Sequence, residues 1–222
     1  MKRFLWYIGT YPLVVKRWVF HLIWPFFPKW VKNTFPPESL LEWLLDLIFY
    51  SIDLCFIPPL YESALILLKS ASLTLSDYEM IIAQSIFGRS LRYDLVRIDP
   101  KPWFVSRKII AWVTFSTIHC KHKMEDHILI HELVHVWQFQ HFGSVYMSKS
   151  LIAHLNAFPY NYGGKENLYQ QMLRGRGLVN FNFEQQAEII EDYFKSTKQK
   201  SEAPMFGNVL GYFAAQLQYP YK

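Results

Sequence analysis

Residues 126–142 have the sequence DHILIHELVHVWQFQHF, which contains neither glycine nor proline. Asp126 is a suitable capping residue at the start of this stretch, and Gly143, a frequent helix stop, follows it directly. The stretch is rich in large apolar side chains: Ile128, Ile130, Leu133, Val134 and Trp137. We therefore predict one uninterrupted helix over 126–142 that is buried in the core.

This helix carries the motif H-E-x-x-H, from His131 to His135. At about 100° per residue, the two histidines point about 40° apart and lie one turn from each other, so both imidazoles can reach one metal ion. Glu132 projects toward the same cavity, where it can accept a proton from a metal-bound water and return it to a leaving amine. Two surface histidines are the alternative, but histidines on a core helix need a partner. We predict a metal site.

The segments around this helix predict an α+β fold. The β-branched and aromatic run 109–119 predicts a long strand, and 95–98 predicts a short one. Further helices are predicted from a cap at Ser76 to a stop at Gly88, over 150–157 and over 184–195. The expected architecture is a small sheet packed on the motif helix and on a second, glutamate-bearing helix.

Residues 1–72 are the most hydrophobic part of the chain, yet charged residues and prolines interrupt every apolar run. A membrane-spanning helix needs about 18 uncharged apolar residues in succession, so we expect none here. The leucines and isoleucines of 38–56 predict an amphipathic helix. The aromatic residues of 18–31 either lie in a membrane interface or cover the back of the next domain. We assign a helical N-terminal annex (1–72), a catalytic domain (73–200) and a C-terminal tail that packs on that domain (201–222).

The strand 109–119 followed by HELVHVWQ resembles the core of zincin metallopeptidases, whose edge strand aligns a substrate peptide beside zinc. The downstream segment FNFEQQAEIIEDYF is similar to the glutamate helix of the gluzincin branch, E-x-x-A-[DE], at Glu184, Ala187 and Glu188. The two segments together most resemble a poorly characterised, largely bacterial group of metallopeptidases. The resemblance covers about residues 73–195 and implies that Glu184 is the third zinc ligand.

Two other residues compete with Glu184 for that role. Glu188 lies one turn further along the same helix face, so periodicity alone does not separate the two. His141 has the offset of the third histidine in the metzincin branch, but Gln138 stands where that branch requires glycine. Without that glycine the helix continues and His141 points away from the metal. We therefore expect Glu184 ahead of Glu188 and well ahead of His141.

Several further residues have two readings in the sequence. Asp192 either orients one of the motif histidines or is a solvated helix charge. Tyr160 and Tyr162 either donate a hydrogen bond to an oxyanion or pack in the core, and packing is the safer expectation. Three histidines precede the motif closely without its spacing and are expected in loops and on the surface: His119, His122 and His127.

Composition limits the partners and the compartment. The 23 lysines and arginines give a net charge of +5 but are scattered, so we expect no nucleic-acid partner. Cys55 and Cys120 lie far apart, which indicates two buried thiols in a reducing compartment. Lys16 and Arg17 interrupt the apolar start of the chain, so we expect no cleaved signal. The expected location is cytoplasmic, with residues 1–72 available for peripheral membrane or protein contact.

The residues and the resemblance together predict a zinc-dependent metallopeptidase. His131, His135 and Glu184 would hold Zn²⁺, and Glu132 would act as the general base in hydrolysis of a peptide or protein substrate. The alternative is a catalytically silent zincin-like protein that binds zinc and acts in recognition of a partner or a membrane surface. Because no position of the motif is degenerate, catalysis is favoured.

Overall fold

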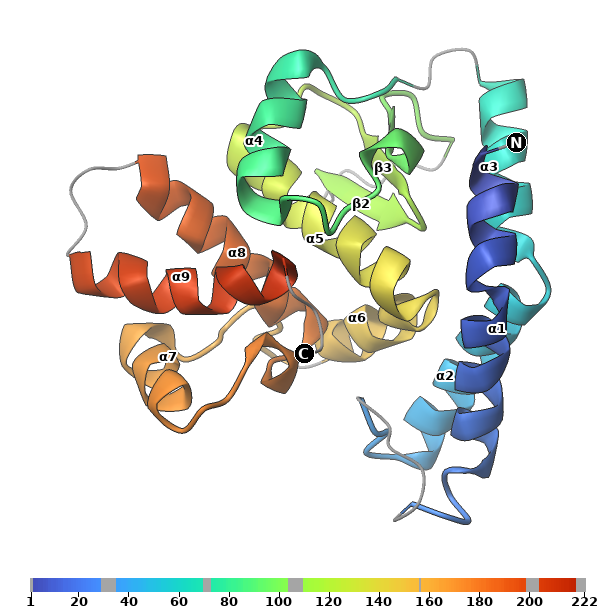
Figure 1. Cartoon of the computed structure of the whole chain (residues 1–222), viewed down its shortest axis with the longest axis horizontal. Coiled ribbons are helices and arrows are strands. Elements are labelled where there is room, and N and C mark those ends of the chain that lie inside the picture. Colours follow the sequence, from blue (N-terminus) through green and yellow to red (C-terminus); the bar gives the residue numbers. More distant parts are fainter. Residues whose placement is uncertain are drawn as a thin grey trace.

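The computed structural model describes residues 2–28, 35–69, 73–103, 110–155, 157–198 and 204–218. The chain is mostly helical with one small mixed sheet, which confirms the predicted α+β class (Figure 1). The helices are α1 (Lys2–Ile23), α2 (Leu40–Leu54), α3 (Ile57–Leu68), α4 (Asp77–Phe87), α5 (Asp126–Phe142), α6 (Val145–Leu155), α7 (Gly164–Leu173), α8 (Phe183–Lys198) and α9 (Pro204–Gln218). The strands are β1 (Arg97–Asp99), β2 (Ala111–Thr114) and β3 (Thr117–Cys120).

Helix α5 lies at the centre of the fold and has the predicted bounds. It ends at Gly143, whose φ of 81° lies in the left-handed region that favours glycine. The residue that precedes the helix as its cap is Glu125, one position before the predicted Asp126, and its side chain makes no capping bond. α5 contacts the sheet, α4, α6 and α8, so apolar residues on several of its sides are buried. Four of the five apolar residues predicted as core are buried, and Ile128, near the start of the helix, is partly exposed.

The three strands form a sheet of order β1-β3-β2, in which β1 is parallel and β2 antiparallel to β3. The single strand predicted over 109–119 is wrong, because the chain reverses at Phe115 and Ser116; residue 109 lies outside the described residues. This turn contains no glycine, and Phe115 adopts a φ of 58°. β-branched residues have the same pattern in one long strand and in a hairpin, so periodicity could not reveal the turn.

The other predicted elements exist with shifted bounds. The short strand begins at Arg97, because Tyr93–Leu95 forms a 3₁₀ turn. Helix α4 begins with the predicted cap, in which Ser76 and Glu79 form a reciprocal capping box. Helix α6 begins five residues before the predicted 150–157 segment, and α8 extends beyond the predicted 184–195 segment at both ends. The C-terminal helix α9 packs against α8, α7 and α4.

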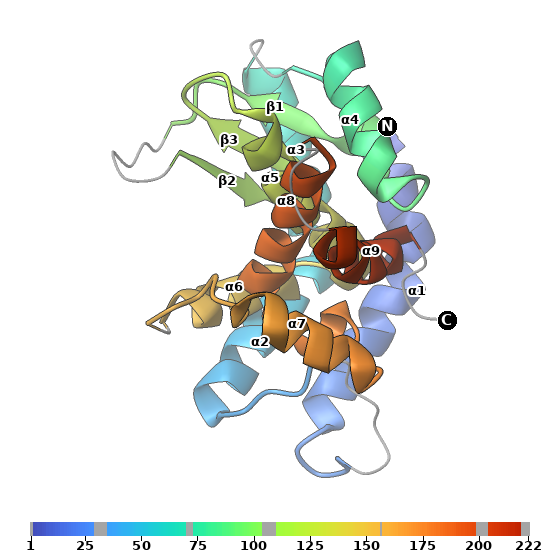
Figure 2. The same ribbon diagram turned by 90° about the vertical axis from the view of Figure 1, so that its left-hand side faces the viewer.

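Helices α1, α2 and α3 form a layer at one side of the molecule (Figures 1 and 2). The amphipathic helix predicted over 38–56 is confirmed as α2. Its acidic residues face inward, and several of its leucines are exposed. No described helix is both long and apolar enough to cross a membrane. Residues 29–31, the end of the aromatic segment 18–31, lie outside the described residues. The three-region division of the chain stays a prediction.

Candidate metal centre

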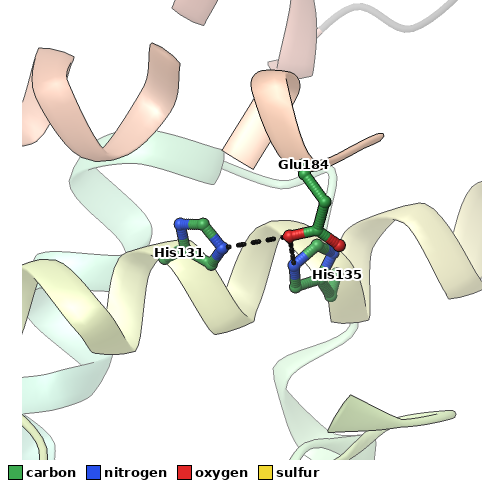
Figure 3. Close-up of side chains that lie close together, drawn as sticks. All are labelled: His131, His135 and Glu184. Atoms are coloured by element: carbon green, nitrogen blue, oxygen red, sulfur yellow. Dashed lines mark ion pairs between the residues drawn. The ribbon is translucent and has the colours of Figure 1, made fainter. Parts of the chain in front are cut away.

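Helices α5 and α8 pack along each other and bring three predicted ligands together. α5 presents His131 and His135 one turn apart, and α8 presents Glu184 in its first turn (Figure 3). The close approach of the two helices is helped by Ala187, which is small and has no exposed surface. Ala187 occupies the position at which the gluzincin resemblance implied a small residue.

The three side chains converge on one point. Glu184 Oε2 lies 3.7 Å from His131 Nε2 and 3.5 Å from His135 Nε2. All three ligand atoms lie within 4.8 Å of one another, and the side chains are 12%, 10% and 4% exposed in the order His131, His135, Glu184. Ligand atoms of a tetrahedral zinc ion are about 3.4 Å apart, given bonds of about 2.0–2.1 Å. The group could therefore hold a metal ion.

Hydrogen bonds at the opposite ring nitrogens orient both imidazoles. His131 Nδ1 donates to Glu191 Oε2 at 2.9 Å, and His135 Nδ1 donates to Gln138 Oε1 at 2.8 Å. With the Nδ1 protons held in this way, each Nε2 presents its lone pair toward Glu184, as metal-binding histidines do. The side chains that support the two rings thus come from one residue on each helix.

The sequence left open whether Asp192 orients one of the motif histidines. Its contacts lie elsewhere. Its carboxylate accepts the hydroxyl of Tyr162 at 2.5 Å and lies 3.6 Å from Lys195. Glu191 takes the orienting role instead. Glu191 lies seven residues, about two turns, after Glu184, so both are on the same face of the helix. This spacing could have predicted its role from the sequence.

In the sequence, Gln138 was noted only because it occupies the position at which the metzincin motif requires glycine. Its side chain is fully buried, and in addition to accepting from His135 it donates to the carbonyl of Phe183 and to Gln186 Oε1, both at 3.0 Å. Gln138 therefore joins the motif helix to the start of the glutamate helix. Its position three residues after His135 places it beside that ring, and this is the signal that could have found it.

The electrostatics favour a positive charge at the centre of the cluster. Burial alone would lower the pKa of His131, but Glu184 and Glu191 outweigh it and raise the pKa to about 10. Burial alone would raise the pKa of Glu184, but His135 and His131 hold it well below its usual range. Glu184 is thus held as a carboxylate, and a metal ion could supply the positive charge without protonation of the imidazoles.

Glu132 supplies a separate reason to expect a metal. It is 7% exposed, and its Oε2 has no hydrogen-bond partner among the described residues. Burial raises its pKa, although His135 and His131 oppose the shift. A buried carboxylate oxygen without a donor is unfavourable, whereas a water molecule polarised by a metal would supply that donor. The donor set and the unpaired Glu132 oxygen together fit zinc.

Glu188, the competing third ligand, lies in a different group. Among the described residues it gathers with His131 and Glu191, whereas Glu184 gathers with both motif histidines. His141 also points elsewhere, because its Nδ1 contacts the carbonyl of Trp137 at 2.9 Å and its ring stacks on that indole. Only the grouping with Glu184 includes both histidines of the motif in the part of the chain that the structure describes.

Tyr160 and His154 lie beside the cluster. The ring centroid of Tyr160 lies 6.0 Å from that of His131 and 5.6 Å from that of His154. His154 Nε2 in turn lies 3.5 Å from Glu184 Oε1, and its side chain is 46% exposed. Of the two tyrosines considered in the sequence, Tyr160 is beside the cluster and Tyr162 is engaged with Asp192. His154 was missed because no spacing links it to the motif.

One of the three histidines expected in loops or on the surface is buried instead. His119 lies in β3, is 3% exposed, and its Nδ1 donates to Asp99 Oδ2 at 3.0 Å. The expectation failed because the run 109–119 forms two strands, and this places His119 in the centre strand of the sheet. His122 is exposed, and His127 is partly exposed near Glu125 and Glu191.

Comparison with known proteins gives limited additional information. No family model matches the chain, and no solved structure matches it. Over 146 residues, 60% of its length, the chain is 28% identical to the type VI secretion system spike protein VgrG2b of Pseudomonas aeruginosa. The chain spans only 14% of that protein's length. No family is assigned by these comparisons, and the resemblance to gluzincins is supported in part, by the grouping of His131, His135 and Glu184.

Proposed function

We propose that this protein is a zinc-dependent metallopeptidase. His131, His135 and Glu184 hold the zinc ion, and Glu132 is the general base. The observation that carries the proposal is the convergence of the two Nε2 atoms on Glu184 Oε2, with the unpaired carboxylate of Glu132 on the same helix. A structural zinc site would use four protein ligands and would not need a buried, unpaired carboxylate beside it.

The residues of the chain divide the chemistry among them. Bound zinc supplies a Lewis acid that polarises the scissile carbonyl and makes water acidic. Glu132 takes the proton from that water and delivers it to the leaving nitrogen as the C–N bond breaks. A carboxylate suits both steps, because it can accept a proton and release it again. Glu191 and Gln138 keep the imidazoles in the tautomer that binds metal.

The substrate side of the site is formed by β2 and Tyr160. β2 pairs with β3 on one side and is one of the two edge strands of the described sheet, so an extended peptide can add to it through backbone hydrogen bonds. Burial raises the pKa of Tyr160 to about 12, which keeps its phenol protonated and able to donate to the developing oxyanion. The proposed substrates therefore have an extended backbone.

The test compares wild type with Glu132→Gln, each purified without a metal-affinity tag. We expect about one zinc per chain in both proteins by elemental analysis, with anomalous scattering across the zinc edge showing His131, His135 and Glu184 as ligands. We expect hydrolysis of a denatured-protein or peptide-library substrate in wild type alone, because the amide cannot accept a proton. Equal hydrolysis by both would exclude Glu132 as the base. Zinc-loaded wild type without any hydrolysis would favour the recognition alternative.

A further inference from the structure

In the layer formed by α1, α2 and α3, ionisable side chains are buried and large apolar side chains are exposed. Its buried side carries ionisable residues: Arg3, His21, Glu42, Asp46, Asp53 and Glu62. Its exposed side, here called the outer face, carries large apolar residues: Leu5, Ile8, Leu13, Val19 and Phe20 of α1; Leu40, Leu41, Leu44 and Ile48 of α2; Ile57, Leu60, Leu67 and Leu68 of α3. Surface helices of soluble domains show the opposite arrangement.

The outer face is continuous along each helix. On α1 the exposed residues from Leu5 to Phe20 recur every three or four positions, and the buried residues from Arg3 to His21 recur on the opposite side of the same helix. α2 and α3 show the same division, and the three helices contact one another. Figures 1 and 2 place them side by side in one layer. An apolar surface of this extent marks an interaction site.

The inward side of the layer is held by specific bonds. Arg3 donates to the carbonyl of Leu95 and pairs with Glu62 at 3.1 Å, while Arg17 donates to the carbonyl of His141. Since these contacts fix α1 to the rest of the protein near both of its ends, its polar side is not available to an external partner. An external partner of the layer therefore contacts the outer face, and the axis of α1 lies parallel to the contact surface.

The chemistry of the outer face suits lipid better than protein. Protein interfaces contain about one hydrogen bond per 100–200 Å², with a polar rim. The exposed positions of α1 from Leu5 to Phe20 offer a single charged or hydrogen-bonding side chain, Lys16. Hydrocarbon requires no such bonds, and a lysine at its edge can extend its ammonium group into the headgroup region. Every acidic residue within α1, α2 and α3 is buried, so the charges left exposed on these helices are those of Lys2 and Lys16.

We propose that the outer face binds the surface of a bilayer that contains anionic lipid, with α1, α2 and α3 lying in the plane of the interface. Apolar side chains enter the boundary between headgroups and acyl chains, and the lysines contact anionic headgroups. This inference does not depend on the metal site. It predicts a protein that binds membranes peripherally through a fixed, folded surface.

The test is flotation of the full-length protein with vesicles of phosphatidylcholine, alone or mixed with phosphatidylglycerol. We expect wild type to float with the mixed vesicles and at least about 10-fold less with phosphatidylcholine alone. The variant Leu41→Glu/Leu44→Glu/Ile48→Glu on α2 should lose at least about 10-fold in binding, because each carboxylate must enter an apolar interface. These side chains are exposed, so the variant should keep its far-ultraviolet circular dichroism and thermal unfolding midpoint.

A matched control places three glutamates on exposed apolar positions outside the layer: Ile81→Glu, Leu155→Glu and Leu173→Glu. This control carries the same added charge and should float like wild type. Failure of wild type to float with either vesicle, or equal flotation of the α2 variant, would overturn the proposal. A wild-type dimer in light scattering that the α2 variant abolishes, without vesicle binding, would assign the outer face to a second copy of the chain and also overturn it.

Discussion

The interface between α2 and α6 and the cluster between α5 and α8 both bury carboxylates, but the two regions satisfy them differently. Lys149 Nζ lies 2.6 Å from Glu42 and 2.8 Å from Asp46, so these two acidic residues of α2 have a cation between them. In the α5–α8 cluster, Glu132 Oε2 has no donor among the described residues, and Glu184 faces two ring nitrogens. Buried carboxylates that pair with a cation of the protein are part of the fold. Buried carboxylates and ring nitrogens that converge without such a cation indicate a binding site.

Substitution of Glu184 in the α5–α8 cluster should have the largest effect, and that effect is on zinc affinity. We expect Glu184→Ala to weaken zinc binding by about 1,000-fold or more, beyond the roughly 10-fold to 100-fold cost of an outer partner. Glu188→Ala is the control on the same helix and should bind zinc nearly as wild type does. Competition against a chelator measures both affinities. If Glu188→Ala loses the metal and Glu184→Ala keeps it, the third ligand has been assigned to the wrong carboxylate.

A substitution in the α2–α6 interface should lower the stability of the protein without changing its zinc affinity. Lys149→Met removes the cation between Glu42 and Asp46, and we expect the free energy of unfolding to fall by about 3 kcal/mol. Urea unfolding at pH 7 measures the loss, and the exposed Lys123→Met is the matched control with no expected effect. Equal stabilities of the two variants would show that the buried ion pairs contribute nothing net.

Asp53, which is also on α2 and accepts hydrogen bonds from Ser144 and Tyr7, should make the stability of the protein depend on pH. Burial raises the pKa of Asp53 to about 6, despite donors from Ser144 and Tyr7. Between its unfolded pKa of about 3.9 and about 6, the folded state binds a proton that the unfolded state lacks, so the contribution of Asp53 to stability falls as pH rises. Asp53→Asn does not titrate. Relative to wild type, this variant should therefore gain about 2–3 kcal/mol between pH 4 and pH 7.

Urea unfolding at pH 4, 5.5 and 7 measures this gain. Asp94→Asn is the control, because its hydrogen bond to Arg92 lowers the pKa of the exposed Asp94 and gives the opposite sign. A gain of Asp53→Asn that stays constant with pH would mean that the pKa of Asp53 is the same in the folded and unfolded protein, and would contradict the raised pKa.

The smallest effect concerns the orientation of His131. Glu191→Ala removes the acceptor of the His131 Nδ1 proton, and we expect about a 10-fold loss of zinc affinity with the fold retained. Asp192→Ala, at the neighbouring position, should leave zinc affinity unchanged because Asp192 contacts Tyr162 and Lys195 instead. The reverse result would restore Asp192 as the orienting residue.

Features encoded by local spacing could be predicted from the sequence. The bounds of α5 follow from the absence of glycine and proline over 126–142 and from Gly143. The shared face of His131 and His135 follows from the helical period alone. The grouping with Glu184 needed a family resemblance in addition, since periodicity did not separate it from Glu188. The hairpin at Phe115 escaped prediction because its turn contains no glycine, proline, asparagine or aspartate, and a single serine, Ser116, is a weak turn signal.

The sequence by itself therefore determined the α+β class, the motif helix and the pair of histidines, because each depends on backbone preferences and spacing within one segment. Only the tertiary structure decided that Glu191 and Gln138 orient the imidazoles and that the acidic side of α2 faces inward. The physical reason is that a helix can rotate about its axis without any change in its own hydrogen bonds. Which face it presents depends on partners far away in the sequence, such as Lys149 for Glu42.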